Sequence, residues 1–279
     1  MTDEDLSIDE KRVFASKAGK TEVFVAAGVG VVVVDVSEDL VGGFRVDHRC
    51  TARDVAGRDG RLAVATDEDV LLAPGYETTG FGPAVAVGLT GSAVVAVGDD
   101  GRVGTLSFDA TLGAGGDEGS ENPAWRTLGT VGEGRAVDGR LVAAAEGVVR
   151  VGDDALHSAG LDDVRDVAAA GPFAATGEGL FYLGNGWMEI EGGSWHAVDA
   201  SIDDERAHAA GDPGVRRRRA TDGGEWRAVD LPITDPVGFA YGDDFVCTVT
   251  ADGTFLVDAG DGPRTQELGL RDVGGVDLP

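Results

Sequence analysis

The sequence predicts an all-β fold, a seven-bladed β-propeller whose blades are four-stranded antiparallel sheets. The first observation is a repeated hairpin: two Val- and Ala-rich runs joined by a tight turn occur seven times. From Gly30 to Gly253 the copies recur about every 37 residues, close to the ~40–45-residue period of propeller blades. The second observation is glycine, which makes up 45 of the 279 residues and has no Gly-X-Y period. Glycines between short apolar runs indicate many turns joining many strands.

The clearest hairpin covers residues 140–153, with predicted strands at 141–145 and 148–151. Glu146 and Gly147 form its predicted turn, since a glycine beside a small acid supplies the positive φ of a tight hairpin. The runs are apolar on both faces, as expected for a sheet that lies between two neighbouring sheets. The other copies are at 22–35, 61–73, 93–106, 172–183, 206–219 and 245–258.

Shorter strands flank each hairpin and complete the blade. Inner strands, next to the axis, are predicted at 53–56, 84–87, 135–137, 165–168 and 237–241. Outer strands are predicted where tryptophan opens a common pattern, at 125–128, 195–198 and 226–229. The turns Asp222-Gly-Gly-Glu-Trp226 and Glu191-Gly-Gly-Ser-Trp195 resemble the Asp-box of the bacterial neuraminidase repeat, one residue short. That resemblance implies a structural turn before an outer strand and says nothing about catalysis.

The ends of the chain offer two ways to close the ring. Residues 271–274 repeat the Arg-Asp-Val pattern of the inner strands and are predicted to form the innermost strand of the first blade. Residues 12–16 would then be an outer strand of the last blade. In the alternative arrangement, residues 12–16 are the first inner strand and the C-terminal segment is an appendage. Residues 1–10 are predicted to be a polar tail, residues 11–279 one propeller domain, and 109–123 a polar insertion in the third blade.

The charge of the chain limits its partners. The formal net charge is −27, with acids along the whole sequence and only three lysines among 23 cationic residues. This composition resembles that of cytoplasmic proteins from extreme halophiles, whose surfaces rely on salt to screen self-repulsion. It argues against nucleic acid and anionic membranes, which both require a basic face. The N-terminus has no apolar signal-peptide region and no run approaches 18 apolar residues, so we expect a cytoplasmic protein.

Candidate binding residues come from two patterns. Arg-Asp pairs recur on predicted inner strands, where they would line a central channel and either neutralise one another or form a polar ring for a ligand or peptide. A loop with Asp47, His48 and Arg49 beside Cys50 is the densest set of reactive side chains, and we expect it near the channel mouth. The predicted binding residues are therefore Asp47, His48, Arg49, Arg53, Asp54, Arg165, Asp166, Arg271 and Asp272.

The sequence shows no catalytic set. No histidine pair has metal-site spacing, no phosphate-binding glycine loop is present, and we expect no cofactor and no metal. A run of four arginines, 216–219, lies on a predicted strand whose side chains alternate between two faces. With two arginines on each face, the run is not expected to converge on one small anion, so we expect these arginines to form ion pairs with acidic neighbours on flanking blades or a partner site.

Residues 48–55 (HRCTARDV) and 62–70 (LAVATDEDV) resemble an uncharacterised family of haloarchaeal β-propeller proteins. The resemblance implies the fold and a halophilic cytoplasm, and it implies no activity. We expect a non-enzymatic propeller that acts as a protein-interaction scaffold for a protein partner. The alternatives are a hydrolase or lyase of the sialidase-like propeller kind, or a small-ligand binder, at the channel mouth.

Overall fold

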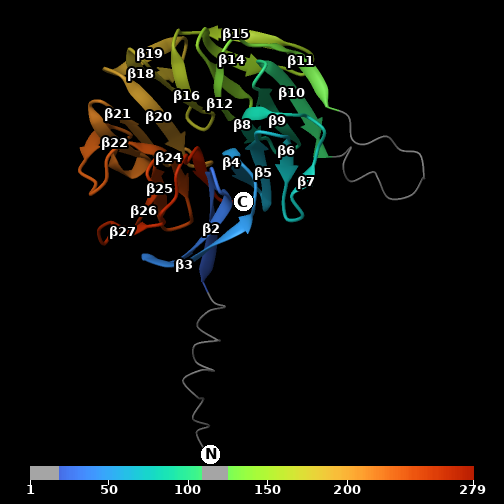
Figure 1. Ribbon diagram of the computed structural model, residues 1–279. Coiled ribbons are helices and arrows are strands. Elements are labelled where there is room, and N and C mark those ends of the chain that lie inside the picture. The colour runs from blue at the N-terminus through green and yellow to red at the C-terminus, as the bar shows by residue number, and fades with distance from the viewer. Residues whose placement is uncertain (1–18, 109–124) are drawn as a thin grey trace, which may run out of the picture.

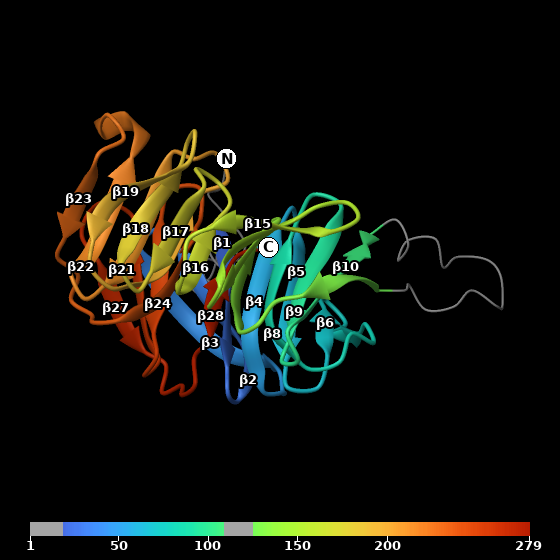
Figure 2. The same cartoon turned by 90° about the horizontal axis from the view of Figure 1, so that it is seen from above.

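The computed structural model describes residues 19–108 and 125–279, and it confirms the predicted fold. Seven antiparallel sheets of four strands each stand around a central axis (Figure 1). Figure 2 shows the same ring from the side. We number the blades 1 to 7 in the order of their hairpins and name their strands from the axis outwards.

The strands of the blades are as follows. Blade 1 consists of β28 (Gly275–Asp277), β1 (Lys20–Ala27), β2 (Gly30–Ser37) and β3 (Leu40–His48). Blade 2 consists of β4 (Ala52–Arg58), β5 (Arg61–Thr66), β6 (Val70–Leu72) and β7 (Glu77–Thr78). Blade 3 consists of β8 (Ala84–Leu89), β9 (Ala93–Gly98), β10 (Arg102–Ser107) and β11 (Arg126–Thr130). Blade 4 consists of β12 (Gly134–Asp138), β13 (Leu141–Ala144), β14 (Gly147–Val151) and β15 (Leu156–Gly160).

The remaining blades follow the same order. Blade 5 consists of β16 (Val164–Ala168), β17 (Phe173–Thr176), β18 (Gly179–Leu183) and β19 (Trp187–Gly192). Blade 6 consists of β20 (Trp195–Ala200), β21 (Arg206–Gly211), β22 (Gly214–Arg219) and β23 (Trp226–Val229), with the 3-10 turn η1 (Ala220–Asp222) before its outer strand. Blade 7 consists of β24 (Pro236–Tyr241), β25 (Val246–Thr250), β26 (Thr254–Asp258) and β27 (Arg264–Glu267).

All seven predicted hairpins are present as the two middle strands of a blade. The hairpin of blade 4 differs from its prediction by one residue: Ala144 pairs with Gly147, so the turn residues are Ala145 and Glu146. Gly147 has φ +130°, and a Cβ there would lie 2.5 Å from the carbonyl oxygen of Leu161. Glycine is therefore required both by the backbone conformation and by the close approach of the neighbouring connection.

The core lies between the blades and not within one central body. One cluster of buried apolar side chains fills each of the seven seams between adjacent blades. The second strands are the most buried; Val23 and Val25 of β1 are examples, because each faces a neighbouring sheet on one side or the other. This arrangement explains why their sequences are apolar on both faces.

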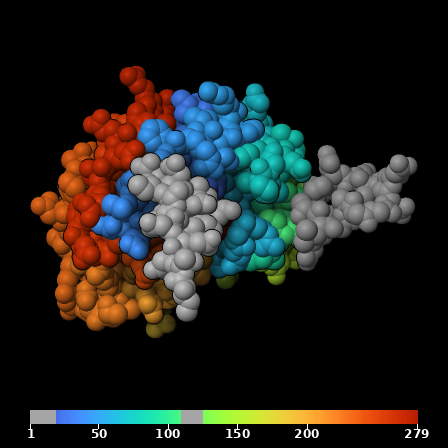
Figure 3. All heavy atoms as spheres, turned by 90° about the horizontal axis from the view of Figure 1, so that it is seen from below, coloured from blue at the N-terminus to red at the C-terminus, as the bar shows by residue number. Residues whose placement is uncertain are grey.

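The ring closes through the C-terminal strand, as the favoured arrangement expected. β28 pairs antiparallel with β1, and Val276 lies opposite Val25. The strand comprises residues 275–277, however, so Arg271 and Asp272 precede it. In Figure 3 the red atoms of the C-terminal region lie against the blue atoms of the first blade. Within the described residues the outer strand of blade 7 is β27, and residues 12–16, which were expected in this position, lie outside the described residues.

The predicted outer strand at 195–198 is also wrong. Trp195–Ala200 is β20, the innermost strand of blade 6, and the outer strand of blade 5 is β19. The turn before Trp195 therefore joins two blades, whereas the turn before Trp226 precedes an outer strand as predicted. Trp195 is completely buried beneath Arg216, which explains why a large apolar residue starts an inner strand here. Residues 1–10, 12–16 and the insertion 109–123 lie outside the described residues.

Candidate functional site in the central channel

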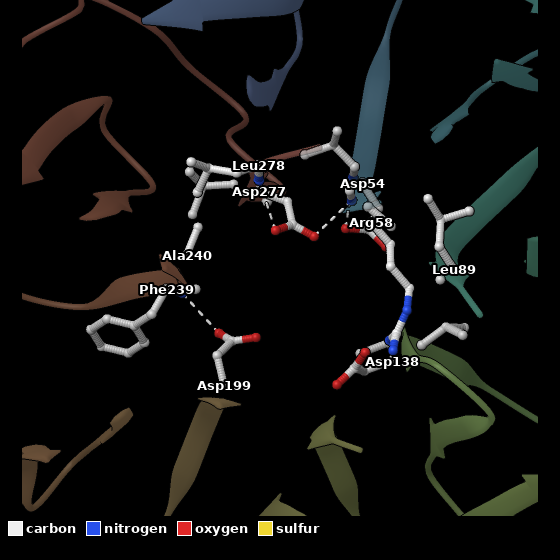
Figure 4. Close-up of a pocket in the computed structure, with 18 of the residues that line it drawn as sticks. Asp54, Arg58, Leu89, Asp138, Asp199, Phe239, Ala240, Asp277 and Leu278 are labelled. Carbon is white, nitrogen blue, oxygen red and sulfur yellow. Dashed lines mark hydrogen bonds between the residues drawn. The ribbon is translucent and has the colours of Figure 1, made fainter. Parts of the chain in front are cut away.

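The inner strands enclose a channel of about 880 Å³. Five aspartates project from its wall, one each from blades 1, 2, 4, 5 and 6, and Figure 4 shows four of them with Arg58, which reaches across towards Asp138. The lining includes part of the predicted Arg-Asp ring. The aspartates are Asp54, Asp138, Asp166, Asp199 and Asp277.

Each of these carboxylates joins two blades. Asp54 accepts hydrogen bonds from its neighbouring amide, Val55, and from the amide of Val87 on the next inner strand, both at 2.9 Å. Asp166 repeats this geometry, with bonds of 2.9 Å from Val167 and 2.8 Å from Val198. The inner strands pair with no neighbour on the channel side, so these carboxylates satisfy amides that would otherwise lack a partner.

The other three carboxylates lie two residues further along their strands. They also accept hydrogen bonds from backbone amides of the next blade. Asp138 accepts a hydrogen bond from the amide of Ala169 at 2.7 Å, and Asp199 accepts one from the amide of Phe239 at 2.8 Å. Asp277 accepts from Gly57 at 2.8 Å, which ties the C-terminal strand to blade 2. Five of the seven seams thus carry a side chain to backbone bond at the axis.

Burial raises the pKa of all five carboxyl groups. The pKa of Asp54 rises to about 7, since burial outweighs the amides of Val87 and Val55. The pKa of Asp199 also rises to about 7, through burial opposed by the Phe239 amide. Burial and then the charge of Asp199 raise the pKa of Asp166 well above its usual range. Burial likewise raises the pKa of Asp138 and of Asp277.

Three arginines and one histidine lie at one end of the channel. Most inner strands begin with a β-bulge, and the bulge residue is Arg53, Arg135, Arg165 or His196 in blades 2, 4, 5 and 6. Arg53 donates to the carbonyl of Ala84 at 3.3 Å, and His196 Nε2 donates to that of Pro236 at 3.0 Å. Each of these side chains therefore reaches the start of the next blade.

The two remaining arginines of this set also bind across their seams. Arg135 pairs with Asp163 at 2.6 Å and donates to the carbonyl of Val164 at 3.3 Å. Arg165 donates to Ser194 Oγ at 2.8 Å. Because all four side chains are only partly buried at the channel mouth, their outer faces remain open to a bound molecule.

The predicted site residues fall into three groups. Arg53, Asp54, Arg165 and Asp166 line the channel, as predicted. The loop residues Asp47, His48 and Arg49 do not line it. Asp47 and His48 end the outer strand β3, and Arg49 follows it. His48 stacks on Tyr76 with ring centroids 4.5 Å apart, and Asp47 accepts a hydrogen bond from the Tyr76 hydroxyl at 2.7 Å. The loop at residues 47–49 is therefore separate from the Arg-Asp residues that line the channel.

Arg271 and Asp272 are the third group, and their predicted place in the ring is wrong. Both are exposed in the connection before β28, and Asp277 occupies the channel position instead. Asp138, Asp199 and Asp277 were missed by sequence reasoning. A signal exists, since Val-Asp follows a small residue at 136–138, 197–199 and 275–277, but the same letters recur at 228–230 beside the outer strand β23.

The described residues contain no group of three or more His, Cys, Asp or Glu side chains suited to a metal ion. Cys50 and Cys247 are free thiols, and burial raises the pKa of both. No helix within 19–108 and 125–279 is long and apolar enough to cross a membrane.

Seven four-stranded blades around an axial channel define a β-propeller, and similar solved structures agree with this class. A functionally unknown protein from Desulfotomaculum acetoxidans is similar over 92% of this chain and 98% of its own, with a TM-score of 0.65 and 11% identity. The computationally designed Ika8 protein matches 92% of this chain and 87% of its own, with a TM-score of 0.60 and 15% identity. At these identities the similarity concerns the fold alone.

A family model identifies the chain more narrowly. The model described as "Beta-prop_HVO_0234:-like, beta propeller" matches residues 7–279, and the protein belongs to this family. This confirms the family resemblance drawn from residues 48–55 and 62–70. No curated protein matches the chain.

Proposed function

We propose that the protein is a non-enzymatic scaffold that binds a protein partner in a salt-rich cytoplasm. The observation that carries this proposal is the free edge of β3, the outer strand of blade 1. β3 has nine residues, whereas the outer strands of the other blades have two to six. Long unpaired edges are the usual sites at which a second chain adds a strand.

The side chains of β3 are suited to such a contact. Leu40, Phe44 and Val46 are 56%, 43% and 40% exposed, which is unusual for large apolar residues. Gly42 and Gly43 precede Phe44, so the backbone there is easily approached. Within the described part of the chain, β3 pairs only with β2, and its other edge offers amides and carbonyls.

The charges on β3 are already paired within the blade. Arg45 pairs with Glu22 at 3.1 Å and with Asp47 at 3.4 Å. A partner strand would therefore not have to displace free charges, and its apolar side chains would meet Phe44 and Val46. The net charge of −27 disfavours nucleic acid as the partner.

The channel supports a role without catalysis. All five channel carboxylates accept backbone amides from the next blade, and raised pKa values of this kind also occur in structural networks. A hydrolase or lyase at the channel mouth would need the loop at residues 47–49 beside the arginine ring, and these side chains are apart in the structure.

The test is site-specific photo-crosslinking in the native cytoplasm at native salt. A photoreactive residue replaces Phe44 in one variant and Met188 in the other. Met188 is a matched control, because it is 51% exposed on the outer strand β19. We expect one discrete protein adduct from position 44 and none from position 188. Identical adduct patterns from both positions, or no adduct from position 44, would count against the scaffold role.

A second candidate is the binding of a small anionic ligand in the channel. It is favoured by the open volume of about 880 Å³ and by Arg53, Arg135, Arg165 and His196 at one mouth. Thermal-shift measurements with a panel of small anions at high salt test it. We expect stabilisation that is lost in Arg53→Gln/Arg165→Gln; a panel without any shift contradicts this candidate.

A further inference from the structure

The four-arginine run of β22 is divided between two seams. Arg216 and Arg218 face blade 5, where Arg218 lies over the ring of Phe173, and both are ion-paired, Arg216 with blade 5 and Arg218 within blade 6. Arg216 binds Glu191 through two hydrogen bonds of 2.7 and 2.6 Å, and Arg218 pairs with Asp204 at 2.9 Å. The pair of Arg216 with Glu191 confirms the expected ion pairing with a flanking blade, whereas Asp204 lies in the β20–β21 connection of blade 6 itself.

Arg217 and Arg219 face blade 7, on the same side of β22 as Val215, which packs against Phe239. Neither arginine has a hydrogen bond or ion pair with any described residue. Within residues 19–108 and 125–279 they are the only partly buried arginines in this condition. Other arginines without an acceptor, such as Arg150 and Arg271, are exposed to water.

The seam next to these arginines is the least apolar of the seven. Its cluster contains four buried residues, Ala197, Ala210, Val215 and Phe239, whereas the seam between blades 7 and 1 contains sixteen. Blades 6 and 7 therefore face each other through polar side chains where other pairs of blades use valine and leucine. An apolar residue at 217 or 219 would have added to this core.

The local potential is positive despite the acidic chain. His208 lies opposite Arg217 on β21, and Arg206 lies opposite Arg219. Burial, followed by the charges of Arg217, Arg219 and Arg206, lowers the pKa of His208 to about 3. Since Arg206 is bound to the carbonyls of Phe245 and Gly242, Arg217 and Arg219 are the two guanidinium groups free to take an anion.

We propose that Arg217 and Arg219 form a binding site for a small dianion that carries two linked oxyanion groups, such as a diphosphate or a dicarboxylate. Residues two apart on a strand lie about 7 Å from each other on one face, so each guanidinium can grip one end of such a molecule. Guanidinium binds carboxylate and phosphate oxygens in pairs. An extended polyanion fits less well, because its remaining charges would lie over a surface of net charge −27.

This site is on blade 6, away from β3, and the inference does not depend on the proposed scaffold function. Isothermal titration with pyrophosphate and with succinate, at an ionic strength where circular dichroism shows a folded protein, tests it directly. Acetate is the single-oxyanion control. We expect at least one dianion to bind at least about tenfold more tightly than acetate, as two charge-assisted pairs imply. Which of the two binds identifies the phosphate or carboxylate source.

Variants then locate the site. Arg217→Gln/Arg219→Gln should lose about tenfold in affinity. The matched control is Arg150→Gln/Arg271→Gln, which removes the same charge from two exposed arginines without acceptors and should change affinity less than about twofold. If the first double variant does not fold, the single variants Arg217→Gln and Arg219→Gln should each lose about threefold. No dianion binding by the wild type, or equal losses in the two double variants, overturns the proposal.

Discussion

Asp54 holds blade 2 to blade 3, and Asp54→Ala should weaken the whole ring. The substitution leaves two amides, those of Val55 and Val87, without their acceptor. A buried unsatisfied amide costs about 1–3 kcal/mol. Because Asp54 is half-buried and faces the channel, water replaces part of each bond. We therefore expect a loss of about 2–3 kcal/mol in the free energy of unfolding at pH 5.

The loss should depend on pH in a defined direction. The pKa of Asp54 is about 7 in the folded protein, above the unfolded value of 3.8, so the folded state binds the proton more tightly. The stability that this proton linkage contributes is complete below about pH 4 and disappears as pH rises through 7. At pH 8 the wild type carries a poorly solvated carboxylate that the variant lacks. The destabilisation by Asp54→Ala should therefore be smaller at pH 8 than at pH 5.

Urea unfolding followed by circular dichroism in constant molar KCl, at pH 5 and pH 8, measures both effects. Asp67→Ala is the control, since Asp67 is exposed and its carboxylate accepts no hydrogen bond from a described residue. It should change stability by less than about 0.5 kcal/mol. Hydrogen exchange at the Val87 amide should accelerate in Asp54→Ala. Equal stability of the two variants at pH 5, or a destabilisation that increases with pH, would refute the role assigned to the carboxylate.

Three further predictions concern the charge and the closure of the ring. Asp199→Asn should reduce the decrease in stability that the wild type shows between pH 5 and pH 8, because the folded pKa of Asp199, about 7, is also above 3.8. Urea titrations in which the variant shows the same dependence of stability on pH as the wild type would contradict this prediction. The thermal midpoint should fall as KCl or NaCl is lowered from molar to millimolar, since −27 charges then repel one another unscreened; a constant midpoint by circular dichroism contradicts the halophilic interpretation. Gly274→Ala should lower the free energy of unfolding in urea by about 2–4 kcal/mol, because its Cβ would lie 1.8 Å from the carbonyl oxygen of Arg53. The control Gly43→Ala, whose Cβ would have nothing within 4 Å, should change stability little. Similar urea midpoints for the two variants would contradict the closure geometry.

The mistaken assignment of Trp195 shows how the repeat can mislead. Residues 195–199 read WHAVD and residues 226–230 read WRAVD, yet the first is an inner strand and the second an outer one. In the first segment, Asp199 accepts a hydrogen bond from a backbone amide of blade 7. Nothing in the local pattern separates the two segments, because the difference lies in what the neighbouring blade presents.

The β-bulges explain a second miss. At Arg53 and Arg165 the bulge residue is followed at once by the bridging aspartate, whereas at Arg135 and His196 the aspartate comes three positions after the bulge residue. Sequence comparison therefore aligned the Arg-Asp pairs and overlooked Asp138 and Asp199. It also extended the ring to Arg271-Asp272, which the strand order excludes.

Local patterns along this chain were sufficient for the hairpins, the number of blades and the closure of the ring by the C-terminal segment, although not for the bounds of the closing strand, because turns and short apolar runs are properties of neighbouring residues. The partners of the polar groups were decided only when the blades were placed side by side. The distance to the neighbouring sheets differs between a carboxylate at the axis, a half-buried arginine and the edge of an outer strand. That distance is set by the ring of blades as a whole. Residues 216–219 are the clearest case: four identical side chains in sequence became two ion-paired and two unpaired arginines, because, in the part of the chain that the structure describes, acceptors lie on only one of the two faces of β22.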